Sequence, residues 1–300
     1  MADERVVRRH TPVVVKAHGS HPGTAEIVGA AVRAAVVKCG MPDGVFSVLF
    51  GSGRTIGQAL VKNAEVKAVG FTGSRAGGRA LMDSAAAREE PIPVWAEMSA
   101  VNPVFILPGA MKERGKEIAQ GLVGSLTMGV GQFCTNPGLV VSGTEGRSEF
   151  ARQVSALASD SAPATMLHKG IAASYHAAVE ALTSKDAVEA LAHVVADADA
   201  SLAGAVVLGT QADDFLADSS MADEMFGPAT LMVEAEGEDK LLAIAEGLEG
   251  QLTATVHATE DDREQFAKLI AVLERKAGRL IYNGFPTGVE VCHAMIHGGP

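Results

Sequence analysis

Short apolar runs and longer stretches with helical spacing alternate along the first hundred residues. Each apolar run is bounded by Gly, Pro or polar turn residues and predicts a buried strand. The predicted strands are 12–16, 45–50 and 66–71, and the predicted helices are 24–38, 75–87 and a shorter one through 58–60. Strand and helix therefore alternate three times, which is the pattern of a doubly wound parallel sheet.

The alternation continues into the second half of the chain. After two short strands at 94–98 and 104–107, the predicted strands are 139–142, 205–208, 229–233, 252–257 and 279–282. The predicted helices are 148–157, 169–182, 239–248 and 261–275. We therefore expect an α/β protein in which a partial doubly wound, Rossmann-like domain precedes a second α/β domain.

Composition and charge narrow the class of protein. At 300 residues, with 47% apolar and 20% charged residues, the chain can form two ordinary globular domains. A net charge of -11 argues against nucleic acid or an anionic membrane as the main partner. No apolar run reaches the length of a membrane span, and the first residues have no apolar core of a signal peptide. Three widely spaced cysteines indicate free thiols in a reducing compartment, so we expect a cytoplasmic protein.

The segment Gly131-Gln132-Phe133-Cys134-Thr135-Asn136-Pro137-Gly138 offers a thiol at a change of structure. It follows a Gly-rich, weakly amphipathic run and precedes an apolar strand, so a loop is predicted to present Cys134. A cysteine on a loop can reach a substrate. The commoner alternative for a single cysteine is a small buried hydrophobic residue.

The turn Gly73-Ser74-Arg75-Ala76-Gly77-Gly78 follows a strand and opens a helix. Glycine lets a phosphate approach the backbone, and the helix N-terminus supplies N–H donors. The dinucleotide fingerprint G-x-G-x-x-G is not matched, so a plain strand–helix turn is an equal alternative.

Two charged residues end predicted strands. Glu97 is either a solvated edge residue or a general base, and Lys16 is either an exposed lysine or a clamp for ribose or phosphate. Glu224-Met225-Phe226-Gly227-Pro228 reads as a turn that fixes an acid and an aromatic ring. The histidines at 18, 21, 293 and 297 have no convincing metal spacing and read as polar loop residues, so we assign no metal.

Four of these motifs together resemble the aldehyde dehydrogenase superfamily. Phe71-Thr72-Gly73-Ser74, Glu97, Gly131–Cys134 and Glu224–Pro228 occur in the order and spacing of that family. The segments 13–24, 71–81, 133–138 and 283–292 are more similar to the 2-oxoglutarate semialdehyde (2,5-dioxopentanoate) dehydrogenases. The resemblance covers nearly all of the chain from Pro12 onward.

The resemblance implies a role for each matching residue. Cys134 is implied to be the nucleophile that forms a thioester with an aldehyde, and Glu97 the base that activates water to hydrolyse it. Met98-Ser99-Ala100-Val101 stands where the family usually has Leu-Gly-Gly-Lys after this glutamate. The implied cofactor residues are Lys16 for the adenosine ribose, Gly73, Ser74 and Gly78 for the pyrophosphate turn, and Glu224 and Phe226 for the nicotinamide riboside.

The resemblance also bears on the choice of cofactor. Many NAD-preferring relatives place a glutamate three residues after the lysine that ends the first strand, where this chain has Gly19. Arg54 resembles the arginine that NADP-using relatives place near the 2′-phosphate. We therefore expect NADP, with NAD possible.

The domain ranges follow from the same resemblance. They are 1–99 for a partial dinucleotide-binding domain, 100–291 for a catalytic thiol domain, and 292–300 for the start of a return segment. The family implies a homo-oligomer, an earlier segment with an oxyanion-hole asparagine, and a later intersubunit strand. We expect the chain to be an internal piece and, without those segments, a poor catalyst on its own.

Two other functional classes stay open. A nucleotide-binding or assembly remnant would keep the fold without turnover. A CoA-acylating enzyme would use the same thioester, although Glu97 counts against it, because a hydrolytic base competes with attack by CoA.

Overall fold

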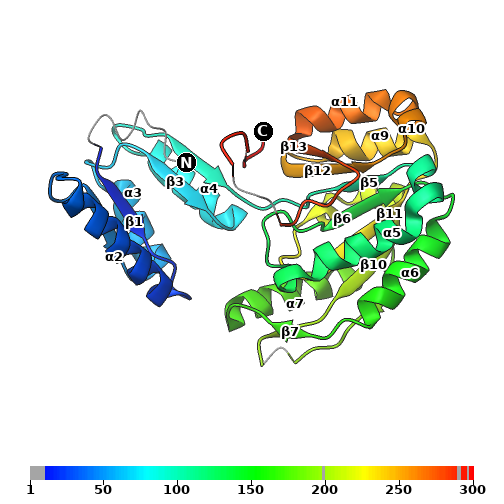
Figure 1. Ribbon diagram of the computed structural model, residues 1–300, viewed down its shortest axis with the longest axis horizontal. Coiled ribbons are helices and arrows are strands. Elements are labelled where there is room, and N and C mark those ends of the chain that lie inside the picture. Colours follow the sequence, from blue (N-terminus) through cyan, green and yellow to red (C-terminus); the bar gives the residue numbers. More distant parts are fainter. Residues whose placement is uncertain (1–10, 198–199, 289–291, 296) are drawn as a thin grey trace. The chain divides into compact units, whose positions relative to one another are not determined.

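The chain folds into two compact units, Met1–Met98 and Ser99–Pro300. The computed structural model describes residues 11–197, 200–288, 292–295 and 297–300. Both units alternate strands and helices, as the hydrophobic pattern predicts (Figure 1). In the described part of the chain, none of the helices combines the length and the apolar character that crossing a bilayer requires.

The first unit consists of two strand–helix–strand crossovers. In chain order its elements are β1 (Val13–Lys16), α2 (Pro22–Lys38), β2 (Phe46–Leu49), the π-helical turn η1 (Gly53–Gly57), α3 (Gln58–Lys62), β3 (Val69–Thr72), α4 (Arg75–Ala86) and β4 (Val94–Glu97). β1 pairs in parallel with β2, and β3 with β4. Within each pair the strands are parallel, so the residues that follow its two strands lie at the same end of that pair.

The second unit contains the larger sheet. Its first elements are β5 (Val104–Ile106), α5 (Pro108–Thr127), the 3₁₀ turn η2 (Met128–Gly131), β6 (Leu139–Ser142), α6 (Arg147–Ser159), β7 (Ala164–Thr165) and α7 (Lys169–Thr183). They are followed by β8 (Glu189–His193), β9 (Leu202–Ala203), β10 (Val206–Gln211), α8 (Ala212–Ala217), the 3₁₀ turn η3 (Ser219–Ala222) and β11 (Ala229–Glu234). The last are α9 (Glu238–Gly247), β12 (Gln251–His257), α10 (Glu260–Gln265), α11 (Ala267–Lys276) and β13 (Ala277–Tyr282).

The seven-stranded sheet has the order β13-β12-β5-β6-β11-β10-β8. All of its pairings are parallel except that of β8, which runs antiparallel to β10. One face packs on α5 and α6 through a buried cluster that includes Ile118, Leu122, Phe150 and Val154. α7, α9 and α11 cover the other face with a second cluster. The unit is therefore a three-layer α/β structure, which is drawn in the right-hand part of Figure 1.

One carboxylate fixes the start of the helix that leads to the thiol segment. Asp262 closes a capping box with Thr259 at the N-terminus of α10. Its two oxygens also accept hydrogen bonds of 2.9 Å from the backbone N–H groups of Gly109 and Ala110 in the first turn of α5. The negative charge thereby lies at two helix N-termini, where the helix dipole favours it.

Most predicted elements are present within a few residues, but the sequence pattern does not predict the short elements β7, β8, β9 and α8. The helix expected at 261–275 is broken at Phe266, which has φ −98° and ψ 27°, so α10 and α11 are separate. The helix before Cys134 begins at Pro108, well before the Gly-rich, weakly amphipathic run 120–131 from which the sequence predicts it. β8 carries Glu-Ala-Leu-Ala-His, which lacks β-branched residues, and only its pairing with β10 makes it a strand.

Candidate active site

The Cys134 thiol lies on a turn between a helix and a strand of the second unit. α5 ends at Thr127, η2 follows, and β6 begins at Leu139. Gly129, Val130 and Gly131 all have left-handed backbone angles, with φ of 56°, 59° and 64°. A β-branched residue in this region costs about 1–3 kcal/mol, so neighbouring contacts must hold the segment. The prediction that Cys134 lies on a loop, and not inside an apolar run, is confirmed, and its thiol is half-buried.

Asn102 holds the backbone of the Cys134 turn. Its Nδ2 donates to the carbonyl oxygens of Cys134 at 2.9 Å and Asn136 at 3.1 Å. Its Oδ1 accepts from the hydroxyl of Thr253 on β12 at 3.0 Å. The Asn102 backbone N–H donates to the side-chain oxygen of Gln251, also on β12, at 3.0 Å. Asn102 is fully buried and joins the thiol turn to a central strand.

The thiol turn packs directly on the Glu224–Pro228 segment. A Cβ on Gly131 would overlap the carbonyl group of Gly227, so the two backbones touch. Asn136 Nδ2 also donates to the Gly227 carbonyl oxygen at 3.0 Å. Two motifs that lie some ninety residues apart in the sequence therefore form one surface, which requires glycine at the contact.

Glu224 sits beside the start of the second unit. Its carboxylate accepts hydrogen bonds from the side chain of Ser99 and the backbone N–H of Ala100, and both lower its pKa. Burial acts more strongly, and the net effect raises the pKa of Glu224 above its ordinary value. Phe226, two residues on, is half-buried. Glu224 is therefore a partly shielded carboxylate close to the thiol turn.

An imidazole lies against the thiol. Nε2 of His297 is 3.4 Å from Sγ of Cys134, within hydrogen-bonding distance for sulfur. The sequence interpretation of His297 as a polar loop residue missed this contact, because 163 residues separate the two positions. No local signal in the sequence indicates it.

In the first unit, Glu97 lies beside the turn Gly73–Gly78, called here the phosphate-type turn because its glycines and helix N-terminus suit a phosphate. Thr72 is the register partner of Glu97, and the backbone N–H of Gly73 donates to the Glu97 carbonyl oxygen at 3.1 Å. The Ser74 hydroxyl caps α4 by accepting from the N–H of Gly77 at 3.3 Å. The described part of α4 has no acid in its first turn, so its N-terminal N–H groups favour an anion.

Gly78 and Lys16 are two further residues of the first unit. Gly78 is buried on α4, where a Cβ would come within 2.7 Å of the Met98 side chain, so this glycine permits close helix–strand packing. Lys16 ends β1, and its Nζ would lie 3.4 Å from a Cβ on Gly53. Arg54 is exposed in the next position of η1. Two cations therefore follow the parallel strands β1 and β2.

These residues fit a phosphate-bearing dinucleotide. Lys16 and Arg54 supply positive charge. Ser74 caps the N-terminus of α4, a helix of 12 residues, whose free N–H groups can bind a phosphate. Gly53 leaves open the space beside the Lys16 ammonium group that a side chain would fill. The chemistry of this donor set suits a ribose and phosphates.

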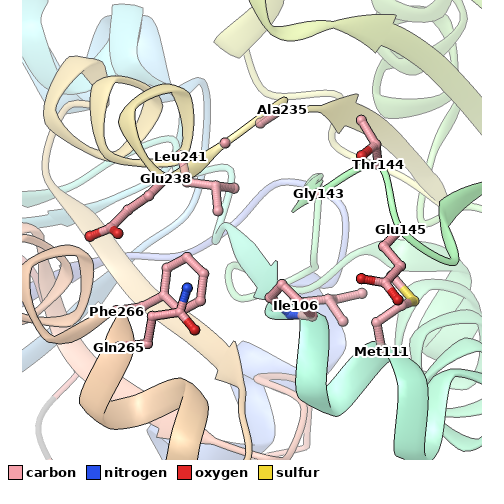
Figure 2. A pocket seen from close by; sticks show the side chains of 12 residues that line it. Ile106, Met111, Gly143, Thr144, Glu145, Ala235, Glu238, Leu241, Gln265 and Phe266 are labelled. Atoms are coloured by element: carbon pink, nitrogen blue, oxygen red, sulfur yellow. The ribbon is translucent and has the colours of Figure 1, made fainter.

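The second unit also has a cavity of about 250 Å³ at the carboxyl ends of its strands (Figure 2). Ile106, Thr144 and Ala235 follow or end β5, β6 and β11, and Glu145 and Glu238 add two carboxylates to the lining. Cys134 precedes β6, so the thiol lies at the amino ends of the strands, opposite the cavity. The usual position of ligands in open α/β sheets would indicate this cavity, whereas the Cys134 thiol lies elsewhere.

Comparison with known proteins places these features in a family. Residues 11–299 match the model of the aldehyde dehydrogenase family. The alpha-ketoglutaric semialdehyde dehydrogenase 2 of Azospirillum brasilense is 52% identical over 292 residues, which are 96% of this chain and 55% of that protein. The alpha-ketoglutaric semialdehyde dehydrogenase of Acinetobacter baylyi is 40% identical over 297 residues, again 96% of this chain and 55% of that protein. The chain thus spans about half the length of the curated relatives it matches.

A solved structure shows the same fold at low sequence identity. The glyceraldehyde-3-phosphate dehydrogenase of Methanocaldococcus jannaschii, complexed with NADP, matches with a TM-score of 0.77 and 20% identity. The match covers 96% of this chain and 60% of that one. The predicted fold class is therefore confirmed.

Proposed function

The chain belongs to the aldehyde dehydrogenase family, and from that premise we propose that it oxidises an aldehyde to a carboxylate through a thioester on Cys134. The observation that carries the proposal is the presentation of this half-buried thiol on a turn held by Asn102. A core cysteine would have no such access. The thiolate attacks the aldehyde carbon, and the resulting thioester is then hydrolysed.

We assign the hydrolytic step to Glu97. A carboxylate at the end of β4 can take a proton from a water molecule that attacks the thioester. Its backbone bond to Gly73 fixes its place beside the phosphate-type turn. This role predicts loss of thioester hydrolysis in Glu97→Gln with retained acylation of Cys134.

We propose a nicotinamide dinucleotide as the cofactor, with NADP preferred and NAD possible. When bound, this cofactor accepts the hydride of the aldehyde. Lys16 and Ser74 would hold its ribose and pyrophosphate, and Arg54 the 2′-phosphate. Glu224 and Phe226 would hold the nicotinamide end. Gly19, where a glutamate would repel a 2′-phosphate, supports the preference for NADP.

We propose 2-oxoglutarate semialdehyde or a related short semialdehyde as the substrate. The support is the 52% identity to a protein named for that activity. The semialdehyde is an anion, and the chain would have to accept its carboxylate near the thiol turn.

The test combines turnover with labelling. The purified chain is assayed for NADPH formation with 2-oxoglutarate semialdehyde and, as a matched neutral aldehyde, with butanal. Aldehyde and NADP are then used to trap the acyl-enzyme, which is mapped by peptide mass spectrometry. We expect label on Cys134 and none after Cys134→Ser. Label on the exposed Cys39 or Cys292 instead would reject the assignment.

A further inference from the structure

The imidazole of His297 and the sulfur of Cys134 form a pair that the proposed function has not used. Their atoms Nε2 and Sγ are 3.4 Å apart. The His297 side chain is exposed and that of Cys134 is half-buried, so solvent and small reagents can reach the pair. A neutral imidazole nitrogen can accept the weak S–H donor, and the imidazolium can donate to a thiolate.

The residues that follow His297 are packed tightly on the sheet. A Cβ on Gly278 of β13 would overlap the carbonyl oxygen of Gly298, and a Cβ on Gly299 would overlap the carbonyl oxygen of Gln251 on β12. Backbone therefore touches backbone on two adjacent strands. Such contacts hold His297 in a defined place beside the thiol.

The same strand also positions the thiol. The side chain of Gln251 accepts hydrogen bonds from the backbone N–H groups of Val101 and Asn102, at 2.8 and 3.0 Å. Asn102 in turn holds the carbonyl oxygen of Cys134. Contacts with Gln251, the first residue of β12, therefore hold both the thiol turn and the segment that carries His297. A contact that is anchored in this way on both sides is not accidental.

We infer that His297 is the base that takes the proton of the Cys134 thiol as its sulfur attacks the aldehyde, an inference that rests on the proposed function of Cys134. The sulfur electron pair forms the bond to the aldehyde carbon, and the π electrons of the carbonyl group move to its oxygen. The thiol proton passes to Nε2, and the imidazolium later releases it to water. Glu97 is then needed only for the hydrolytic water, and the two bases act in separate steps.

Other ionisable groups lie on the segments packed around the pair. In the second unit, the described residues of these segments include Glu224, Glu249, Arg279, Cys292 and His293. Carboxylates favour the imidazolium and disfavour the thiolate, and a guanidinium has the reverse effects. The effect of His297 is therefore measured as a difference between variants that share one background, in which Glu224, Glu249 and Arg279 are unchanged.

The test measures the reactivity of the thiol itself. In the 300-residue chain, Cys39→Ser and Cys292→Ser leave Cys134 as the single thiol. The rate of its alkylation by iodoacetamide is followed from pH 5 to 10, because the thiolate is the reacting form. With His297 present, we expect the rate to remain high well below pH 8.5, the ordinary pKa of a cysteine being about 8.5. His297→Asn and His297→Gln should each slow alkylation at pH 7 about tenfold or more, since one unit of thiol pKa changes the thiolate fraction about tenfold.

His293→Asn is the matched control, because it removes an exposed imidazole four positions earlier on the same segment. It should leave the pH profile unchanged. Circular dichroism and thermal melting verify that each variant is folded. Coinciding profiles for His297→Asn, His297→Gln and the unsubstituted residue would overturn the inference.

The outcome separates this inference from the proposed function. Should no form of the chain oxidise an aldehyde while the alkylation profiles differ as expected, the thiol–imidazole proton transfer stands and the proposed function fails. Should aldehyde be oxidised through Cys134 while the profiles coincide, His297 is not its base. The alkylation readout depends on neither cofactor nor turnover.

Discussion

The side-chain amide of Asn102 donates a hydrogen bond of 2.9 Å to the carbonyl oxygen of Cys134. The same residue has φ 47°, in the left-handed region that asparagine tolerates better than most residues. Both properties matter, because the strained segment 129–131 precedes the thiol and needs an external support. Asn102 provides it from a loop whose partners lie on β12.

We predict that Asn102→Ala destabilises the second unit by about 2–4 kcal/mol, because it leaves buried carbonyl groups unsatisfied and strains the backbone. Asn102→Gly removes the same side chain but accepts the positive φ, so it should cost about 1 kcal/mol less. Urea unfolding of both variants measures this difference. Equal stability of Asn102→Ala and the unsubstituted chain would contradict the role of the amide.

How much of the structure the sequence predicts depends on how far apart in the chain the contacting residues lie. The strand and helix pattern and the position of Cys134 on a turn follow from local periodicity and turn residues, and the structure confirms them. Asn102 was not singled out, because its partners are 32, 34 and 151 residues away. His297 was read as a loop residue for the same reason. A single sequence carries no signal for such contacts.

Local propensity also failed where tertiary pairing decides the structure. Residues 189–193 have little β propensity, and the edge of a neighbouring strand draws them into the sheet. Phe266 interrupts a helical pattern whose apolar spacing is continuous, and its side chain is buried in the core cluster to which α9 and α11 also contribute. In both cases packing overrides the local pattern.

A second prediction concerns pH and His257. This residue is 2% exposed, and neither ring nitrogen has a hydrogen-bond partner among the described residues. Burial, with a smaller effect of the Arg114 charge, lowers the pKa of His257 to about 4. The unfolded chain therefore binds more protons between about pH 6.5 and 4, so the free energy of unfolding should fall as the pH drops through this range.

The contribution of His257 is isolated by difference. Its slope should approach about 1.4 kcal/mol per pH unit within that window and vanish above it. His257→Phe keeps a ring beside Phe285 and should remove this part of the pH dependence. The exposed His293→Asn serves as the control. Parallel pH profiles for His257→Phe and the unsubstituted chain would contradict the prediction.

A third prediction concerns the choice between NADP and NAD. Arg54→Ala should weaken NADP binding about ten- to a hundredfold, because a guanidinium–phosphate contact contributes roughly 1.5–3 kcal/mol. NAD, which lacks the 2′-phosphate, should be affected little. Lys38→Ala, at the exposed end of α2, controls for the loss of one charge. Calorimetric titration measures both constants, and an equal loss for the two cofactors would show that Arg54 does not contact the 2′-phosphate.

The last prediction tests the contact between the thiol turn and the Glu224–Pro228 segment. Gly131→Ala places a Cβ on the carbonyl group of Gly227 at a left-handed position, where neither backbone can yield cheaply. We expect a loss of at least about 2 kcal/mol in the free energy of unfolding. Gly124→Ala is the matched control, since a Cβ on that exposed position of α5 has no neighbour within 4 Å. It should raise stability by about 0.5–1 kcal/mol, because alanine favours a helix interior over glycine. Urea unfolding gives both values, and alkylation of Cys134 should change only in Gly131→Ala, where the turn itself is displaced.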